Sequence, residues 1–179
     1  MNKNVLIIST SPRRGGNSET LADEFARGAA EAGNNVEKIC IYDKNINFCR
    51  GCLVCQNTEK CVIEDDMHRI LETMIKSDVI VFATPVYFYG MSGQMKTILD
   101  RTNPLFPSDY AFQDIYLLAT AADSDKNSMD GAIKGLQGWI DCFEKTDLKG
   151  VVRGLGLEGA GAVTGKAVLN EAYEMGKNI

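Results

Sequence analysis

Three stretches of the chain combine residue types that suit ligand chemistry, and the first spans residues 9–18. It holds three serines, two arginines, two adjacent glycines and an asparagine, between an apolar run and a helical pattern. A loop leading from a strand into a helix presents unpaired backbone N–H groups and the positive end of the helix dipole. Hydroxyls and an arginine add hydrogen bonds, and glycines allow close backbone approach. The stretch predicts a phosphate site, against the alternative of an ordinary capped helix start.

The second stretch places four cysteines close together in the sequence. They are Cys49, Cys52, Cys55 and Cys61. The spacing of the first three is typical of a ferredoxin-type run, in which a short loop covers one face of an iron–sulfur cubane and a fourth thiol completes the ligation. Zinc is less favoured because its paired-cysteine knuckles usually lie well apart. A redox disulfide, or thiols packed in the loop without any metal, are the other interpretations that the spacing leaves open.

The third stretch, residues 84–90, follows the most continuous apolar run of the chain. Its Thr-Pro pair is expected to end a buried strand and to leave three consecutive aromatic residues at the edge of the sheet. These are Tyr87, Phe88 and Tyr89. Aromatic faces at such an edge favour a platform for a flat ligand. The alternative is that the rings simply pack where the strand ends.

Apolar runs and helical patterns alternate along the chain, which predicts the elements that position these stretches. Strands are expected at residues 5–8, 36–42, 79–83, 115–120 and 150–155, and helices at 19–33, 67–76, 92–101, 131–145 and 166–177. Such alternation predicts an α/β fold with a parallel sheet covered by helices on both faces. Because ligands of such folds bind beyond the carboxyl ends of the strands, the first and third stretches should meet there. A phosphate site beside an aromatic platform suits a flat cofactor with a phosphate tail.

Length and charge limit the classes of protein that the chain can represent. Its 179 residues are expected to form one domain, 1–179, in which the cysteine-rich residues 49–61 form an insertion. A net charge of -5 argues against non-specific nucleic-acid binding. No apolar run approaches membrane length and none resembles a signal peptide, so we expect a cytoplasmic protein without a membrane partner. In that compartment cysteines serve more often as ligands, redox groups or buried thiols than as disulfides.

Several motifs together resemble the NADPH-dependent FMN reductase family of the flavodoxin-like superfamily. They are Thr10-Ser11-Pro12-Arg13, Gly16-Asn17-Ser18, and residues 84–89 and 91–96. The four cysteines and residues 61–67 are similar to the iron–sulfur flavoprotein branch of that family. The resemblance implies a flavodoxin-like three-layer αβα domain with a five-stranded parallel sheet in the order 2-1-3-4-5. It also implies FMN as cofactor, NADPH or NADH as reductant and a homodimer or homotetramer.

The resemblance implies roles for individual residues. Five would hold the FMN phosphate: Ser9, Ser11, Arg13, Asn17 and Ser18. Seven would carry the isoalloxazine ring: Thr84, Pro85, Val86, Tyr87, Phe88, Tyr89 and Gly90. Cys49, Cys52, Cys55 and Cys61 are the candidate ligands of a [4Fe–4S] cluster. Hydride transfer to a flavin needs no side-chain acid or base, so no catalytic residue is predicted.

Three functions are compatible with these features. The first is an FMN-dependent oxidoreductase that takes hydride from NAD(P)H and reduces a small acceptor, such as a quinone, a flavin or a nitroaromatic. The second is an electron carrier that relays electrons between ferredoxin-like partners through FMN and a [4Fe–4S] cluster. The third is a non-redox phosphate- or nucleotide-binding module, which leaves the aromatic stretch unexplained.

Overall fold

A computed structural model of the chain describes residues 2–179. Its main sheet is parallel, with the strand order β2-β1-β3-β5-β6. The strands of this sheet are β1 (Asn4–Ser9), β2 (Asn35–Cys40), β3 (Val79–Tyr87), β5 (Asp114–Thr120) and β6 (Asp147–Gly154). The two-residue strand β4 (Gly90–Met91) pairs antiparallel with the end of β3. The predicted parallel order is confirmed, and β4 is an addition that the sequence did not indicate.

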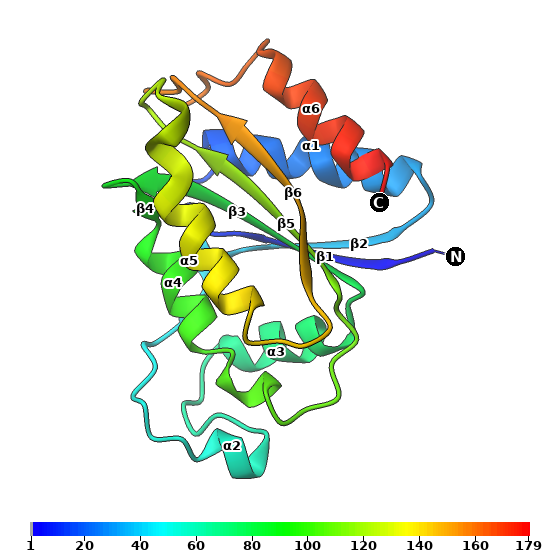
Figure 1. Cartoon of the computed structure of the whole chain (residues 1–179), viewed down its shortest axis with the longest axis vertical. Coiled ribbons are helices and arrows are strands. Elements are labelled where there is room, and N and C mark those ends of the chain that lie inside the picture. The colour runs from blue at the N-terminus through cyan, green and yellow to red at the C-terminus, as the bar shows by residue number, and fades with distance from the viewer. Residues whose placement is uncertain (1) are drawn as a thin grey trace.

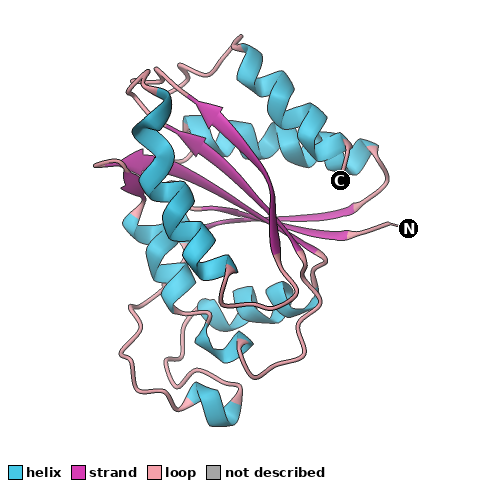
Figure 2. Ribbon diagram, viewed as in Figure 1, coloured by secondary structure: helices cyan, strands magenta, loops and turns pink. Residues whose placement is uncertain are grey.

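Helices cover both faces of the sheet, as Figure 1 shows and Figure 2 repeats by element type. One face carries α1 (Asn17–Glu31) and α6 (Ala167–Lys177), and the other carries α3 (Met67–Lys76), α4 (Gly93–Asp100) and α5 (Asp130–Ile140). A one-turn helix, α2 (Cys55–Thr58), lies apart from the sheet, and 3-10 turns span Ile41–Asp43, Asn103–Leu105 and Lys126–Met129. The fold is the α/β arrangement of flavodoxin-like proteins.

The central strands are apolar without alternation because both of their faces are buried. In β1, Leu6 and Ile8 pack under α3 and α4, whereas Val5 and Ile7 pack against α1. On the α1 side the helices approach very closely. A Cβ added to Gly28 would lie 2.1 Å from the Tyr173 carbonyl oxygen, and one added to Gly176 would lie 2.1 Å from that of Phe25. The two glycines therefore allow α6 to dock on α1.

Three element boundaries differ from the sequence-based expectation by three or more residues. Strand β3 runs on from Ala83 to Tyr87, β6 begins at Asp147, and α5 ends at Ile140. No helix among residues 2–179 is both long enough and apolar enough to cross a membrane.

Candidate functional site

Buried hydroxyls join the loops that follow β1 and β3. The Thr10 backbone N–H and its hydroxyl both donate to the Ala83 carbonyl oxygen, at 2.8 and 2.9 Å. Ser92, at the start of α4, donates to Thr10 Oγ1 (3.2 Å), and its own N–H donates to Thr84 Oγ1 (3.1 Å). Thr84 is fully buried, so its side chain fixes this junction and does not face the edge. The first and third sequence stretches are thereby held together at the carboxyl edge of the sheet.

Two buried hydroxyl groups at the two ends of the loop after β1 have no hydrogen-bond partner among residues 2–179. These are Ser9 Oγ and Ser18 Oγ, whose residues are 0% and 1% exposed. Leaving a buried polar group unsatisfied costs about 1–3 kcal/mol, so native structures seldom keep one without a reason. Ser18 lies in the first turn of α1, where free backbone N–H groups also favour an anion. The arrangement is therefore suited to a ligand that supplies several acceptor oxygens.

The other residues predicted to bind phosphate lie on the same loop in different settings. Ser11 Oγ accepts the Arg13 N–H (3.1 Å) and donates to the Arg13 carbonyl oxygen (2.9 Å), which shapes the turn. The Arg13 side chain is exposed beside it. Asn17 is turned toward the loop before α6, where Nδ2 donates to the Gly159 carbonyl oxygen (2.8 Å) and Oδ1 accepts the Val163 N–H (3.3 Å). The Asn17 side chain therefore ties two loops together.

Glu19 also shapes this loop, and the sequence analysis missed it. Its carboxylate accepts the Gly15 N–H (2.7 Å) and the Cys40 thiol (3.3 Å), and it lies near the Lys38 ammonium. Burial alone would raise the pKa of Glu19, but these donors and the Lys38 charge lower it, so the group stays ionised. Acidic residues are favoured in the first turn of a helix, where free backbone N–H groups and the helix dipole attract a negative charge.

The aromatic stretch forms a short hairpin between β3 and β4. Phe88 and Tyr89 occupy its turn with positive φ values of 49° and 61°. Tyr87, Phe88 and Tyr89 are exposed, Phe88 completely. The Tyr89 hydroxyl donates to Asp123 (3.2 Å), which belongs to the loop after β5. The predicted aromatic platform therefore stands at the carboxyl edge, open to a planar ligand.

The four cysteines lie around one small hollow of about 20 Å³. Cys49 and Cys52 are exposed, Cys61 is half-buried and Cys55 is buried. Cys49 Sγ accepts the Gly51 N–H (3.4 Å) and the Asn103 side-chain N–H (3.8 Å). The structure thus gathers the four predicted ligands from one loop.

The donor set fits a cubane better than a single ion. No group of three His, Cys, Asp or Glu side chains within residues 2–179 is arranged to hold one metal ion. A closed zinc site needs its ligands to converge on one point. In a four-cysteine cubane each thiolate binds a different iron, so the sulfurs surround a volume and do not meet at a point. Four thiols around a hollow, with N–H donors to sulfur already present, match the second arrangement in ligand type and number, and the hollow of about 20 Å³ would have to widen to admit a cubane.

A model of the family described as NADPH-dependent FMN reductase matches residues 3–150 of this chain. An iron-sulfur flavoprotein of Methanocaldococcus jannaschii is 44% identical over 101 residues, which cover 56% of this chain and 52% of that protein. An iron-sulfur flavoprotein of Methanosarcina thermophila is 30% identical over 134 residues, covering 74% of this chain and 70% of that protein. The match thus spans about half the length of the first relative and 70% of the length of the second.

Solved structures share the fold at low sequence identity. An NAD(P)H:quinone oxidoreductase from Methanothermobacter marburgensis superposes with a TM-score of 0.78 at 16% identity, covering 99% of this chain and 96% of that one. An azoreductase from Bacillus anthracis gives a TM-score of 0.73 at 16% identity, with both chains fully covered. At this identity the likeness establishes the architecture and nothing further.

Proposed function

The chain belongs to the NADPH-dependent FMN reductase family, close to its iron–sulfur flavoprotein branch, and we propose that it is an FMN-dependent oxidoreductase. In this proposal it takes hydride from NAD(P)H and reduces a small acceptor such as a quinone, a flavin or a nitroaromatic. The observation that carries the proposal is the pair of buried hydroxyls without partners, Ser9 Oγ at the end of β1 and Ser18 Oγ in the first turn of α1. A phosphate monoester offers the acceptor oxygens that these groups lack.

The loop after β1 would hold the FMN phosphate. Ser9 and Ser18 would donate their hydroxyl protons to phosphate oxygens, and the free N–H groups at the start of α1 would add to them. The exposed Arg13 guanidinium would close over the anion from the solvent side with a charge-assisted bond. Glu19 would act indirectly, because its contact with the Gly15 N–H fixes the turn that carries these donors.

The hairpin of residues 85–90 would carry the isoalloxazine ring. FMN, when bound, supplies the chemistry, because its ring accepts hydride from a nicotinamide and passes electrons to an acceptor. The protein side chains would bind and orient it, and none is needed as a general acid or base. Tyr87, Phe88 and Tyr89 are exposed, which is consistent with a permissive site for small planar acceptors.

A second function, electron transfer between ferredoxin-like partners through FMN and a [4Fe–4S] cluster, is favoured by one specific observation. Cys49, Cys52, Cys55 and Cys61 line the same hollow. An oxidoreductase that uses only FMN gives these four thiols no purpose. The relatives named iron-sulfur flavoproteins support the same alternative.

Anaerobic stopped-flow measurement of flavin absorbance separates the two functions. The protein is loaded with FMN and mixed with NADPH, NADH or a reduced ferredoxin, beside a variant in which all four loop cysteines are replaced by serine. The oxidoreductase proposal expects bleaching by a nicotinamide in both proteins. The carrier alternative expects bleaching by reduced ferredoxin, lost in the variant. Failure of the wild type to retain FMN would contradict both.

We also propose that the protein forms a homodimer or homotetramer. Light scattering at micromolar concentration should give two or four times the mass of the 19.6 kDa chain. A monomeric mass would contradict this part of the proposal.

A further inference from the structure

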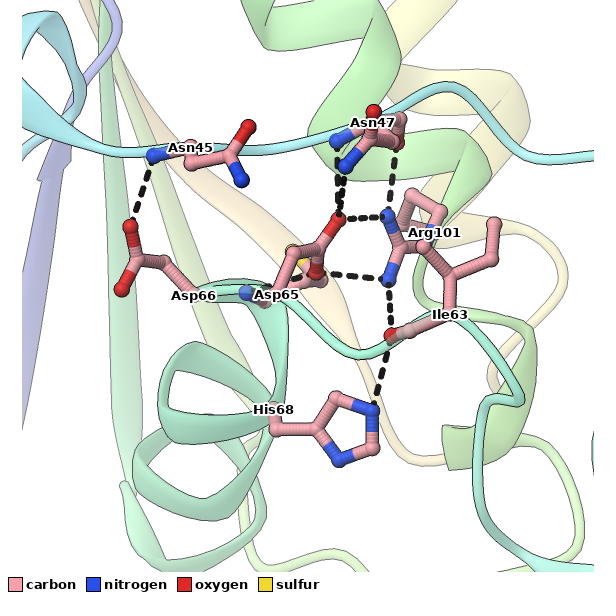
Figure 3. Close-up of polar contacts among 8 residues, drawn as sticks. Asn45, Asn47, Ile63, Asp65, Asp66, His68 and Arg101 are labelled. Carbon is pink, nitrogen blue, oxygen red and sulfur yellow. Dashed lines mark hydrogen bonds and ion pairs between the residues drawn. The ribbon is translucent and has the colours of Figure 1, made fainter.

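One buried arginine connects both ends of the cysteine loop, defined here as residues 49–61. Arg101 follows directly after α4, and its side chain is 0% exposed. Its Nη1 donates to the Asn47 carbonyl oxygen (2.6 Å), before the loop, and its Nη2 donates to the Ile63 carbonyl oxygen (3.4 Å), after it. Figure 3 shows the guanidinium between these two segments. The segments just before and just after the cysteine loop are therefore both bound to the Arg101 side chain.

The positive charge of Arg101 is balanced by Asp65, whose side chain is also 0% exposed. The pair is bidentate, with Nη1–Oδ2 at 2.7 Å and Nη2–Oδ1 at 2.9 Å. Asp65 also accepts the N–H groups of Asn47 (2.8 Å) and Met67 (3.1 Å). Burial alone would raise the pKa of Asp65, but these donors hold it well below its usual range.

A buried ion pair adds little stability compared with well-packed apolar residues, because both charges must lose their water. The presence of a buried ion pair is better explained when the pair holds chain segments in one defined arrangement. The Arg101–Asp65 pair joins the segment before the cysteine loop to the segment after it, beside the hydrogen bonds between Asn45 and Asp66, which is a geometric task of this kind.

One donor of Arg101 is left over. Its Nε is buried and has no hydrogen-bond partner among residues 2–179, whereas the rest of the guanidinium is fully engaged by Asp65 and the two carbonyl groups. Arg101 lines the same hollow as the four cysteines. Burial would lower the pKa of Arg101, but Asp65 and the nearby Cys61 raise it, so Cys61 lies within electrostatic reach. The Nε–H is therefore a buried donor without an acceptor among residues 2–179, on a side chain that lies close to Cys61.

We propose that Arg101 is the positioning residue of the cysteine loop, which fixes both ends of the loop and directs a positive charge and a free Nε–H toward the group that the four sulfurs ligate. The inference rests on the proposed [4Fe–4S] group. A cluster ligated by four thiolates is an anion, and one-electron reduction adds a further negative charge. Net charge and hydrogen bonds to sulfur set the reduction potential of such clusters. Arg101 should therefore favour the reduced form, and Asp65 should oppose it.

The test compares the cluster reduction potentials of the wild type, Arg101→Met, Asp65→Asn and Arg101→Lys after anaerobic reconstitution, by EPR-monitored titration. Arg101→Met leaves the Asp65 charge uncompensated and should shift the equilibrium at least tenfold toward the oxidised form, which is about 59 mV for a one-electron couple. Asp65→Asn should shift it in the opposite direction, and Arg101→Lys should lie nearer the wild type. Two variants that merely loosened the loop would not differ in sign. Shifts in the same direction, or none, overturn the electrostatic part of the proposal.

A second readout does not depend on the cluster. Mass spectrometry follows thiol alkylation in the cluster-free, FMN-loaded protein. Arg101→Met and Arg101→Lys should label Cys55 and Cys61 at least tenfold faster than the wild type, whereas Cys142, exposed beyond α5, serves as the internal control. Retained FMN shows that a variant is folded, and Arg101→Lys replaces Arg101→Met if the latter fails that check. A wild type that takes up no iron or sulfide refutes the proposed cluster alone, while unchanged labelling refutes the positioning role of Arg101.

Discussion

The carbonyl oxygen of Tyr89 rests against Gly131 in the first turn of α5, where an added Cβ would lie 2.3 Å from it. One turn further along the helix, Gly135 makes room for Met91, whose Cε would lie 2.8 Å from a Cβ at that position. Two glycines of α5 thus support the aromatic hairpin from behind. The position of the proposed ring platform is therefore set by a helix that follows the next strand of the sheet.

Gly131→Ala should displace the hairpin, because the obstructing atom is backbone and not a flexible side chain. We expect the change to destabilise the fold by roughly 1–3 kcal/mol, the usual cost of overpacking, and to weaken FMN binding. Gly138→Ala in the same helix is the matched control, since no atom lies within 4 Å of its added Cβ. That control should keep its FMN affinity and gain up to about 1 kcal/mol of stability from better helix propensity. Fluorescence titration measures the FMN affinity of both variants, and urea unfolding measures their stability. Equal FMN affinities would refute the supporting role of Gly131.

Arg13→Ala should weaken FMN binding by about 1.5–3 kcal/mol if the guanidinium makes a charge-assisted contact with the phosphate. Arg14→Ala is the control, because the Arg14 guanidinium lies 4.8 Å above the Tyr42 ring, which already gives it a partner on the protein. Isothermal titration of FMN compares the two variants. An unchanged affinity in Arg13→Ala would assign the phosphate contacts to hydroxyls and backbone N–H groups.

Asp65 should make the stability of the protein depend on pH in acid. Its folded-state pKa is depressed below the ordinary value of 3.8, so its contribution is complete above that value and is lost as the pH falls through the folded-state pKa. At pH 7, Asp65→Asn should cost about 3–5 kcal/mol, because Arg101 would remain buried without its partner.

Urea unfolding of both proteins from pH 7 to pH 2 measures this contribution. The difference in the free energy of unfolding between the wild type and Asp65→Asn should shrink as the pH falls below 3.8. Asp66→Asn is the control, because the exposed Asp66 contacts the Asn45 N–H (2.6 Å) and not the buried arginine. A difference between wild type and Asp65→Asn that stayed constant with pH would show that Asp65 does not act as a carboxylate.

The sheet order and the two loops at its edge were predictable because they depend on local patterns. Both faces of β1 and β3 are buried, which leaves continuous apolar runs in the sequence. The serines and glycines after β1 favour a turn through their local conformational preferences alone. The extension of β3 to Tyr87 was not predictable from the Thr84-Pro85 pair, because it depends on pairing with β4 across the hairpin. Similarly, apolar residues recur at helical spacing as far as Phe143, but α5 ends at Ile140.

Long-range contacts explain what the sequence analysis missed at the candidate site. Arg101 appears in the sequence as an ordinary charged residue at the end of a helix, and its partner Asp65 is 36 positions away. Asp65 stands just before α3, where its carboxylate accepts the Met67 N–H as an ordinary helix-start aspartate would. Nothing local indicates that both charges are buried. Glu19 differs, because an acidic residue in the first turn of a helix is a local preference that the sequence alone shows.

If the loop after β1 binds the phosphate of FMN, the protein should distinguish FMN from riboflavin. Riboflavin has the same ring without the phosphate. The dissociation constants of both compounds are measured for the wild type and for the double variant Ser9→Ala, Ser18→Ala. We expect the wild type to bind FMN much more tightly than riboflavin. The double variant should lose about 1 kcal/mol or more of FMN binding per hydroxyl while its riboflavin affinity stays the same. Equal affinity of the wild type for the two flavins, or an equal loss of affinity for both flavins in the variant, would show that the loop after β1 does not bind the phosphate.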